Sequence, residues 1–191
     1  MSVIEAPRLL LAFALAACLV VVLPGATADA AKRKRGGACA NVDTLPGPGN
    51  LGEIRAAVLC LNNRERAAHG LPPLRENPKL RRAAQGHSDD MVASGFFAHE
   101  SLSGADMADR ILRTGYARNQ SWSLGENIAW GTYNLGTAAE IQRAWMESPG
   151  HRANILRRQF REIGIGVAVG APVGSGGLEG ATYTADFGVR R

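Results

Sequence analysis

The 191-residue chain lacks several features that would place it at once in a common class of protein. Its apolar run from Leu9 to Leu23 is fifteen residues long, whereas a membrane-spanning helix needs roughly 20. It has no H-E-x-x-H motif of the common metalloprotease type. Neither Ser101 nor Ser148 lies in a G-x-S-x-G nucleophile elbow. These absences disfavour a membrane-spanning segment in the apolar run and the hydrolase classes that are easiest to recognise.

The first thirty residues are typical of a secretory signal peptide. Arg8 precedes the apolar run, and the small residues after it form A-x-A cleavage patterns that end at Ala28 and Ala30. The sequence Leu15-Ala16-Ala17-Cys18 resembles a lipoprotein cleavage box, so lipid anchoring through Cys18 is an alternative. The apolar run continues past Cys18 and favours the simple signal. We therefore predict a signal peptide over residues 1–30 and a secreted, extracellular protein.

Basic residues dominate the charge of the mature chain. Cleavage after residue 30 removes two acidic residues and one basic residue, which moves the net charge from +5 to +6. A basic secreted protein is attracted to lipid headgroups or anionic cell-wall polymers, although the same charge also serves solubility. We do not expect nucleic acid as a partner, because export is predicted and the run from Lys32 to Arg35 has no interleaved aromatic residue.

Removal of the signal peptide leaves two of the three cysteines, Cys39 and Cys60. An even pair in an oxidising compartment predicts a disulfide bond. This bond would tie residues 31–50, a basic segment rich in Gly and Pro that we expect to be a flexible arm, to the first helix. Residues 51–191 are expected to form one domain.

Apolar spacing and capping residues predict helices in the first part of the domain. We expect them at about 52–69, from Asn77 to near Gly95, at 106–114, from Thr137, and in a short segment capped by Ser148 that carries His151. Segments 162–169 and 181–188 are predicted to be strands. Because helices precede strands, the fold class is α+β.

A series of short motifs follows in a characteristic order. These are Leu61-Asn62-Asn63-Arg64-Glu65-Arg66, His87-Ser88-Asp89-Asp90-Met91, FFAHES, GENIAWG, WMESPGHRANIL, EIGIGVAV and YTADFG. The series resembles the CAP superfamily (cysteine-rich secretory proteins, antigen 5 and pathogenesis-related proteins) in its compact bacterial, SCP-like form. The resemblance implies an α-β-α sandwich, with a small antiparallel sheet between helices and a cleft on one side.

The resemblance also implies that His99, Glu126 and His151 meet in this cleft. His151 lies in the first turn of its predicted helix, where the dipole favours a neutral imidazole that can bind a metal. Two histidines and one carboxylate suit a divalent cation, with zinc favoured and one position open. Glu126 could instead orient a histidine or fix its own turn by accepting backbone hydrogen bonds.

A fourth cleft residue is doubtful. Larger relatives carry a glutamate on the helix before the second histidine, but the matching position here is Ser148, and Glu147 is one residue earlier. One step along a helix rotates a side chain by about 100°. We therefore expect Glu147 to lie off the inner face of its helix, and we keep it only as a doubtful member of the site.

Two further histidines and three tryptophans are given structural roles. His87 falls on the apolar face of its predicted helix and is expected to be a hydrogen-bonded core residue. His69 is placed in the last turn of the first helix, where a cation suits the dipole. Trp122, Trp130 and Trp145 are interpreted as core or as cleft wall.

The sequence thus predicts a secreted binding module whose cleft holds a divalent cation or a small ligand. The alternative is a protease or esterase that activates a metal-bound water, or a serine such as Ser101 or Ser148. A third hypothesis assigns the function to the basic arm, which would tether the protein to the cell envelope. In that case the cleft would be vestigial.

Overall fold

The computed structural model describes residues 38–191, apart from residues 175 and 177. The predicted signal peptide, Cys18 and the Lys32 to Arg35 run lie outside the described residues, so these predictions stay untested. Within the described part, no helix is both long enough and apolar enough to cross a membrane.

The helices form where local signals predicted them. They are α1 (Leu51–Ala68), α2 (Pro78–Ser94), α3 (Met107–Arg113), α4 (Ala138–Glu147) and α5 (Pro149–Ile155), with a short 3-10 helix η1 (Tyr133–Gly136) before α4. Helix α2 shows why. The Asn77 side chain accepts hydrogen bonds from the backbone N–H groups of Lys79 and Leu80, and Gly95 ends the helix with a φ of 69°.

The sheet differs from the prediction of a purely antiparallel one. Its strands β1 (Arg75–Glu76), β2 (Trp122–Thr132), β3 (Glu162–Val169) and β4 (Gly180–Arg190) lie in the order β1-β3-β4-β2. β4 pairs antiparallel with both neighbours, but the two-residue β1 runs parallel to β3, so the sheet is mixed. β1 is too short to leave a periodic signal, and β2 is covered on both faces at its centre, which removes the alternation that marks a half-exposed strand.

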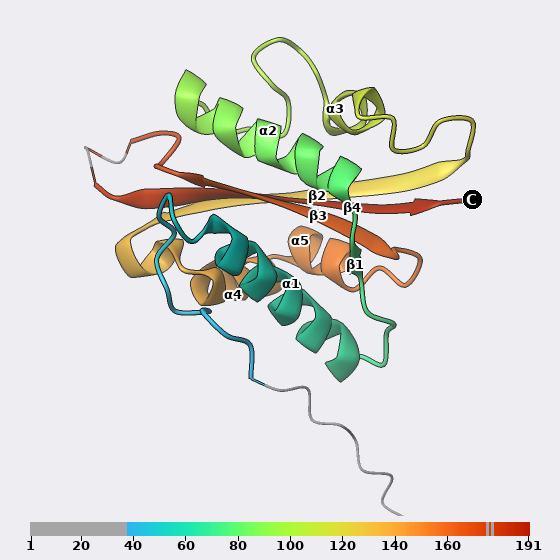
Figure 1. Ribbon diagram of the computed structural model, residues 1–191, viewed down its shortest axis with the longest axis horizontal. Helices are drawn as coiled ribbons and strands as arrows, with labels where there is room; N and C mark the ends of the chain where they lie inside the picture. Colours follow the sequence, from blue (N-terminus) through green and yellow to red (C-terminus); the bar gives the residue numbers. More distant parts are fainter. Residues whose placement is uncertain (1–37, 175, 177) are drawn as a thin grey trace, which may run out of the picture. The chain divides into compact units, whose positions relative to one another are not determined.

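Helices cover both faces of the sheet, which confirms the α-β-α sandwich. α2 and α3 lie on one face, and α1, α4 and α5 lie on the other (Figure 1). Side chains of a strand alternate between faces. In β4, Tyr183, Ala185 and Phe187 therefore join the core under α1, α4 and α5. Thr184 points the other way and accepts a 2.9 Å hydrogen bond from Ser88 of α2.

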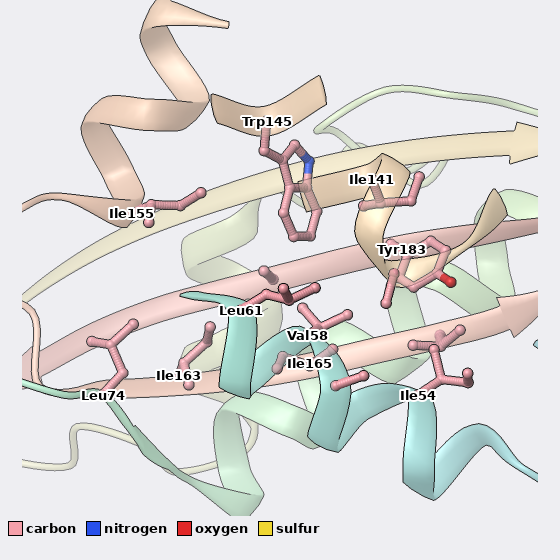
Figure 2. Close-up of a cluster of buried hydrophobic side chains, with 14 of the residues drawn as sticks. Ile54, Val58, Leu61, Leu74, Ile141, Trp145, Ile155, Ile163, Ile165 and Tyr183 are labelled. Atoms are coloured by element: carbon pink, nitrogen blue, oxygen red, sulfur yellow. The ribbon is translucent and has the colours of Figure 1, made fainter. Parts of the chain in front are cut away.

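The larger core lies between the sheet and α1, α4 and α5 (Figure 2). Trp145 is 1% exposed, and its indole Nε1 donates to the carbonyl of Ile128 at 3.1 Å. This confirms the structural role of Trp145. Trp122, by contrast, is 44% exposed at the start of the edge strand β2 and is not a core residue. It lines a surface hollow instead.

Glycines in β3 allow α2 to pack directly on the sheet. A Cβ atom at Gly164 would collide with the backbone of Leu80 and Arg81, and one at Gly166 would collide with the backbone of Ala84. The alternation in EIGIGVAV therefore reflects close helix–strand contact.

Arg66 connects α1 to the segment that follows α5. This arginine is fully buried, and its guanidinium donates to the carbonyl oxygens of Pro72, Ile155, Arg157 and Phe160. A buried cation needs such acceptors. The bonds fix where α5, and with it His151, lies against the rest of the domain.

Residues 38–50 are tied to the domain, so the expectation of a flexible arm was wrong for this part. Cys39 and Cys60 form the predicted disulfide. The carbonyl of Val42 accepts a 2.9 Å hydrogen bond from the backbone N–H of Ala139, and the Asn41 side chain donates to Glu53 at 3.0 Å. These bonds attach the segment to both α1 and α4.

Removal of the disulfide should destabilise the domain. The two cysteines are 21 residues apart. Closing a loop of that size lowers the entropy of the unfolded chain and so raises its free energy by about 3 kcal/mol. We expect Cys39→Ser/Cys60→Ser to lower the free energy of unfolding by about this amount in urea denaturation. Wild type measured with reductant should match the variant. Equal midpoints for oxidised wild type and the variant would contradict the expectation.

Candidate functional site

The candidate site is built on β2, which is the edge strand of the sheet. Because its side chains alternate, Glu126 faces α2 and α3, and Asn127 faces α5. Asp186 of β4 lies directly opposite Glu126 in the antiparallel register. Residues on either side of the sheet can therefore meet at this edge.

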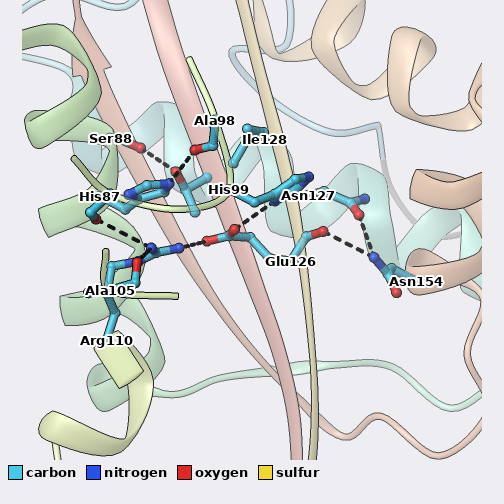
Figure 3. A network of polar contacts seen from close by, with 12 residues as sticks. His87, Ser88, Ala98, His99, Ala105, Arg110, Glu126, Asn127, Ile128 and Asn154 are labelled. Atoms are coloured by element: carbon cyan, nitrogen blue, oxygen red, sulfur yellow. Dashed lines mark hydrogen bonds and ion pairs between the residues drawn. The ribbon is translucent and has the colours of Figure 1, made fainter. Parts of the chain in front are cut away.

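The Glu126 carboxylate is buried, with only 2% of its side chain exposed, and both of its oxygens are bonded. Oε1 accepts from His99 Nδ1 at 2.8 Å, and Oε2 accepts from Arg110 Nη2 at 2.7 Å (Figure 3). Burial alone would raise the pKa of Glu126, but the hydrogen bond from His99 and the charge of Arg110 bring it below its usual value. Glu126 is therefore an anion that orients His99 and leaves its Nε2 for other partners.

Arg110 is a site residue that the sequence analysis missed. It lies on α3 with its side chain 10% exposed, and its Nη1 also donates to the Ala105 carbonyl at 2.9 Å and to Ser101 Oγ at 3.4 Å. In the sequence it resembles Arg113, which is exposed in the last turn of the same helix. Only the packing of α3 against β2 separates the two arginines.

A layer of buried polar groups lies beneath Glu126. Asp186 is 1% exposed, and neither of its side-chain oxygens has a hydrogen-bond partner among the described residues. Burial, and then the charge of Glu126, raises the pKa of Asp186 well above its usual value, so this carboxyl is neutral. A lone aspartate within the apolar strand pattern YTADFG was the one sequence signal for this residue.

His87 belongs to the same buried layer. It is 1% exposed, and its Nε2 lies 2.9 Å from the carbonyl oxygen of Ala98 (Figure 3), which confirms the predicted hydrogen-bonded core residue. Burial lowers the pKa of His87. The bond to Ala98 also holds the segment that carries His99.

His151 approaches the edge strand from the opposite face. The Asn127 side chain donates to the His151 carbonyl at 3.0 Å, and Asn154 donates to the Glu126 carbonyl at 3.1 Å and to Asn127 Oδ1 at 2.9 Å. These bonds hold α5 against β2. Burial, and then the electrostatic effect of the neighbouring His99, lowers the pKa of the half-buried His151 imidazole. The pKa of His151 is lowered, as the sequence analysis predicted from the helix dipole, but burial is the largest cause.

A hollow of about 400 Å³, the His99 hollow, opens beside the site. Its lining includes His99 and Glu126 together with Glu100, Asp106, Met107 and Ala108, but not His151. The His99 side chain is 57% exposed. Glu100 and Asp106 are exposed, so the mouth of the hollow carries negative charge.

The three predicted metal ligands do not form a closed set in this structure. Among the described residues, no group of three or more His, Cys, Asp or Glu side chains lies close enough together to hold a metal ion. Glu126 already uses both oxygens, which fits a residue that orients His99 better than a direct ligand. The structure brings His99 and Glu126 into contact with His151 nearby, and metal binding itself stays a prediction.

Glu147 and the two serines lie apart from the histidines. Glu147 is exposed at the end of α4, and its Oε1 accepts from Arg143 Nη1 at 2.8 Å. Its position agrees with the expectation that it lies off the inner face. Ser101 contacts Arg110, and Ser148 is the N-cap residue of α5 by position, although its side chain makes no capping hydrogen bond to that helix.

The layered fold agrees with the CAP superfamily that the motif series predicted. Two histidines and a buried glutamate lie at the edge of its sheet. The model of the CAP family, described as the cysteine-rich secretory protein family, matches residues 59–186, more than half of the chain. The chain therefore belongs to this family.

Two curated relatives come from Bacillus subtilis (strain 168). The chain is 35% identical over 123 residues to the uncharacterized protein YkwD, covering 64% of this chain and 46% of that protein. It is 34% identical over 110 residues to the uncharacterized membrane protein YlbC, covering 58% of this chain and 30% of that protein. The chain thus spans less than half the length of each of these relatives.

Solved structures share the fold. An extracellular protein containing an SCP domain from Bacillus anthracis matches with a TM-score of 0.59 and 28% identity, over 76% of this chain and 44% of that chain. An outer surface protein from Borrelia burgdorferi matches with a TM-score of 0.56, over 77% of this chain and 97% of that chain. At 16% identity, the second likeness concerns the fold alone.

Neutralising Glu126 should destabilise the protein strongly. Glu126→Gln leaves the buried Arg110 guanidinium without its anion, and breaking a buried pair in this way costs about 3–5 kcal/mol. We expect a loss of this size in the free energy of unfolding, measured in urea. Glu147→Gln is the matched control at an exposed pair and should leave the midpoint unchanged. Equal effects of the two substitutions would show that Glu126 is not held as an anion.

Asp186→Asn should change how stability depends on pH. In the wild type, Asp186 stays protonated when folded but ionises near its usual pKa of 3.8 when unfolded. Above that pH the folded state binds more protons, so stability falls as pH rises until the raised folded pKa is reached.

The asparagine variant keeps a neutral side chain of the same shape and escapes this loss. From about pH 4 up to the raised folded pKa of Asp186, the variant should gain up to about 1.4 kcal/mol per pH unit over wild type in urea unfolding. Asp43→Asn, at an exposed position, controls for the change in net charge. Parallel curves for wild type and Asp186→Asn would contradict a neutral Asp186.

Proposed function

We propose that this CAP-family protein acts outside the cytoplasm as a binding module. The disulfide between Cys39 and Cys60 supports this location, since such bonds persist in oxidising compartments. The signal-peptide pattern of residues 1–30 supports it as well. A structural relative from Bacillus anthracis is described as an extracellular protein.

The ligand site of the proposed module is the His99 hollow and the adjoining edge of β2. One observation carries this assignment: the buried Glu126 anion holds the His99 imidazole through Nδ1. Among the described residues, Nε2 of this ring has no hydrogen-bond partner. A carboxylate that fixes the tautomer of a half-exposed histidine is the usual support of a metal-binding imidazole.

The surrounding charges favour a cation as part of the ligand. Glu100 and Asp106 line the His99 hollow, and the pKa of the nearby His151 is lowered, which keeps its imidazole neutral near pH 7. We infer that a divalent ion, with zinc favoured, binds between His99 and His151. Water or a small ligand would complete its coordination.

A binding role is favoured over the hydrolase alternative. Ser101 Oγ contacts Arg110, and neither Ser101 nor Ser148 is hydrogen-bonded to an imidazole among the described residues. A serine nucleophile needs such a base. Hydrolysis by a metal-bound water remains the competing candidate, and the experiment below separates the two.

Zinc titration tests the proposal directly. We expect mature protein beginning at Ala31, freed of metal, to bind zinc with roughly micromolar or tighter affinity in calorimetry. His99→Ala/His151→Ala should lose this binding, because both proposed ligands are removed. His69→Ala removes an exposed histidine outside the site and should bind as wild type does.

Other outcomes would overturn parts of the proposal. No heat with wild type would exclude the cation, and zinc binding by the double variant would place the ion elsewhere. Casein or a simple ester provides the test for catalysis. Zinc-dependent turnover that disappears in the double variant would replace the binding module with a metal-dependent hydrolase.

A further inference from the structure

A second charged surface lies at one end of the sheet, where β3 begins and β4 ends. Two hollows of about 680 Å³ and 250 Å³ adjoin there and share Val189 in their linings. Neither shares a lining residue with the His99 hollow. This end is therefore a separate candidate for binding.

Arginines dominate both linings, and we call this set the arginine face. Arg75, Arg161 and Arg190 line the larger hollow, and Arg157 and Arg191 line the smaller one. The acidic residue in these linings is Glu162, whose oxygens already accept from Arg190, Tyr116 and Asn77. The arginine face therefore carries a clear excess of positive charge.

Most of this charge has no counter-ion within the described part of the protein. Arg190 pairs with Glu162, but Arg75, Arg157, Arg161 and Arg191 have no carboxylate of a described residue within 4.0 Å. Arg81 and Arg143, on other surfaces, do pair with glutamates. Like charges gathered without partners repel one another, so an anionic ligand would stabilise this surface.

Several contacts position the guanidinium groups. Arg157 stacks over the buried Phe160 ring at 5.2 Å from its centroid. Arg161 Nη1 donates to the Phe160 carbonyl at 2.9 Å. The backbone N–H of Arg75 in β1 donates to the carbonyl of Arg161, the residue before β3, at 2.9 Å, which places these two arginines side by side. Their remaining N–H groups match carboxylate or phosphate oxygens.

Trp122 adds an aromatic platform to this surface. Its indole is 44% exposed and lines the smaller hollow beside Gln159, Ser121 and Ser123. A large exposed aromatic ring among amide and hydroxyl groups suits a ligand with both an apolar ring face and many hydroxyls. Sugar rings have both properties.

We propose that the arginine face binds an acidic polysaccharide. Trp122 would stack on a sugar ring, while the unpaired arginines hold carboxylate or phosphate groups along the chain. Concave hollows with polar walls fit a polymer strand better than a flat membrane surface. The choice of a glycan over nucleic acid rests on the proposed location outside the cytoplasm.

Titration with an oligogalacturonate of defined length tests the proposal, with its methyl-esterified form as the uncharged control. EDTA is present throughout, so the result does not depend on a cation in the His99 hollow. We expect binding of the charged oligosaccharide that weakens as salt is raised, because screening acts on exposed charges. The methyl ester should bind at least roughly tenfold more weakly.

Variants then locate the binding surface. Arg75→Gln/Arg191→Gln removes two side chains that make no hydrogen bond among the described residues, and it should weaken binding roughly tenfold or more. Arg82→Gln/Arg113→Gln makes the same charge change at exposed positions outside both linings and should bind like wild type. Circular dichroism confirms that each variant is folded.

Substitutions of Trp122 separate glycan recognition from simple charge attraction. Trp122→Ala should weaken binding roughly tenfold, whereas Trp122→Phe keeps an aromatic ring and should stay within about threefold of wild type. Equal effects of the two arginine pairs, or no effect of Trp122→Ala, would overturn the proposal. Tighter binding to phosphatidylglycerol vesicles or to single-stranded DNA would also overturn it.

Discussion

The arrangement at the edge of the sheet depends on one buried anion, Glu126. A carboxylate this deep is tolerated only with charged or hydrogen-bonding partners, and Arg110 and His99 supply them. The bond from Arg110 holds α3 against β2, and the bond from His99 sets the orientation of the His99 ring. Asp186, directly opposite, remains neutral, because burial and then the nearby charge of Glu126 both raise the pKa of its carboxyl.

The edge position of β2 lets both faces of the sheet contribute to one site. His99 comes from the face of α2 and α3, while His151 comes from α5 on the other face and is held there by Asn127 and Asn154. Arg66 anchors the segment after α5 through its carbonyl groups. The protein also separates its charges, with an acidic mouth at the His99 hollow and the arginine face at the end of the sheet.

Sequence patterns predicted the elements that local chemistry controls. Helix α2 begins at an asparagine cap with a following proline and ends at a left-handed glycine, all of which are signals within a few residues. β2 was missed because helices cover both of its faces at the centre, and β1 because it acquires its strand character only by pairing with β3. The described part of the arm was misjudged, since its order comes from a disulfide and from contacts with α4.

The sequence by itself determined the family, the order of the helices, the cysteine pair and three residues of the candidate site, His99, Glu126 and His151. Those depend on motifs, caps and composition, which are local. Only the tertiary structure decided that Arg110 neutralises Glu126, that Asp186 is buried and neutral, and that four arginines gather without counter-ions among the described residues. These properties arise from contacts between residues far apart in the chain, and burial changes the energy of a charge in a way that no local pattern records.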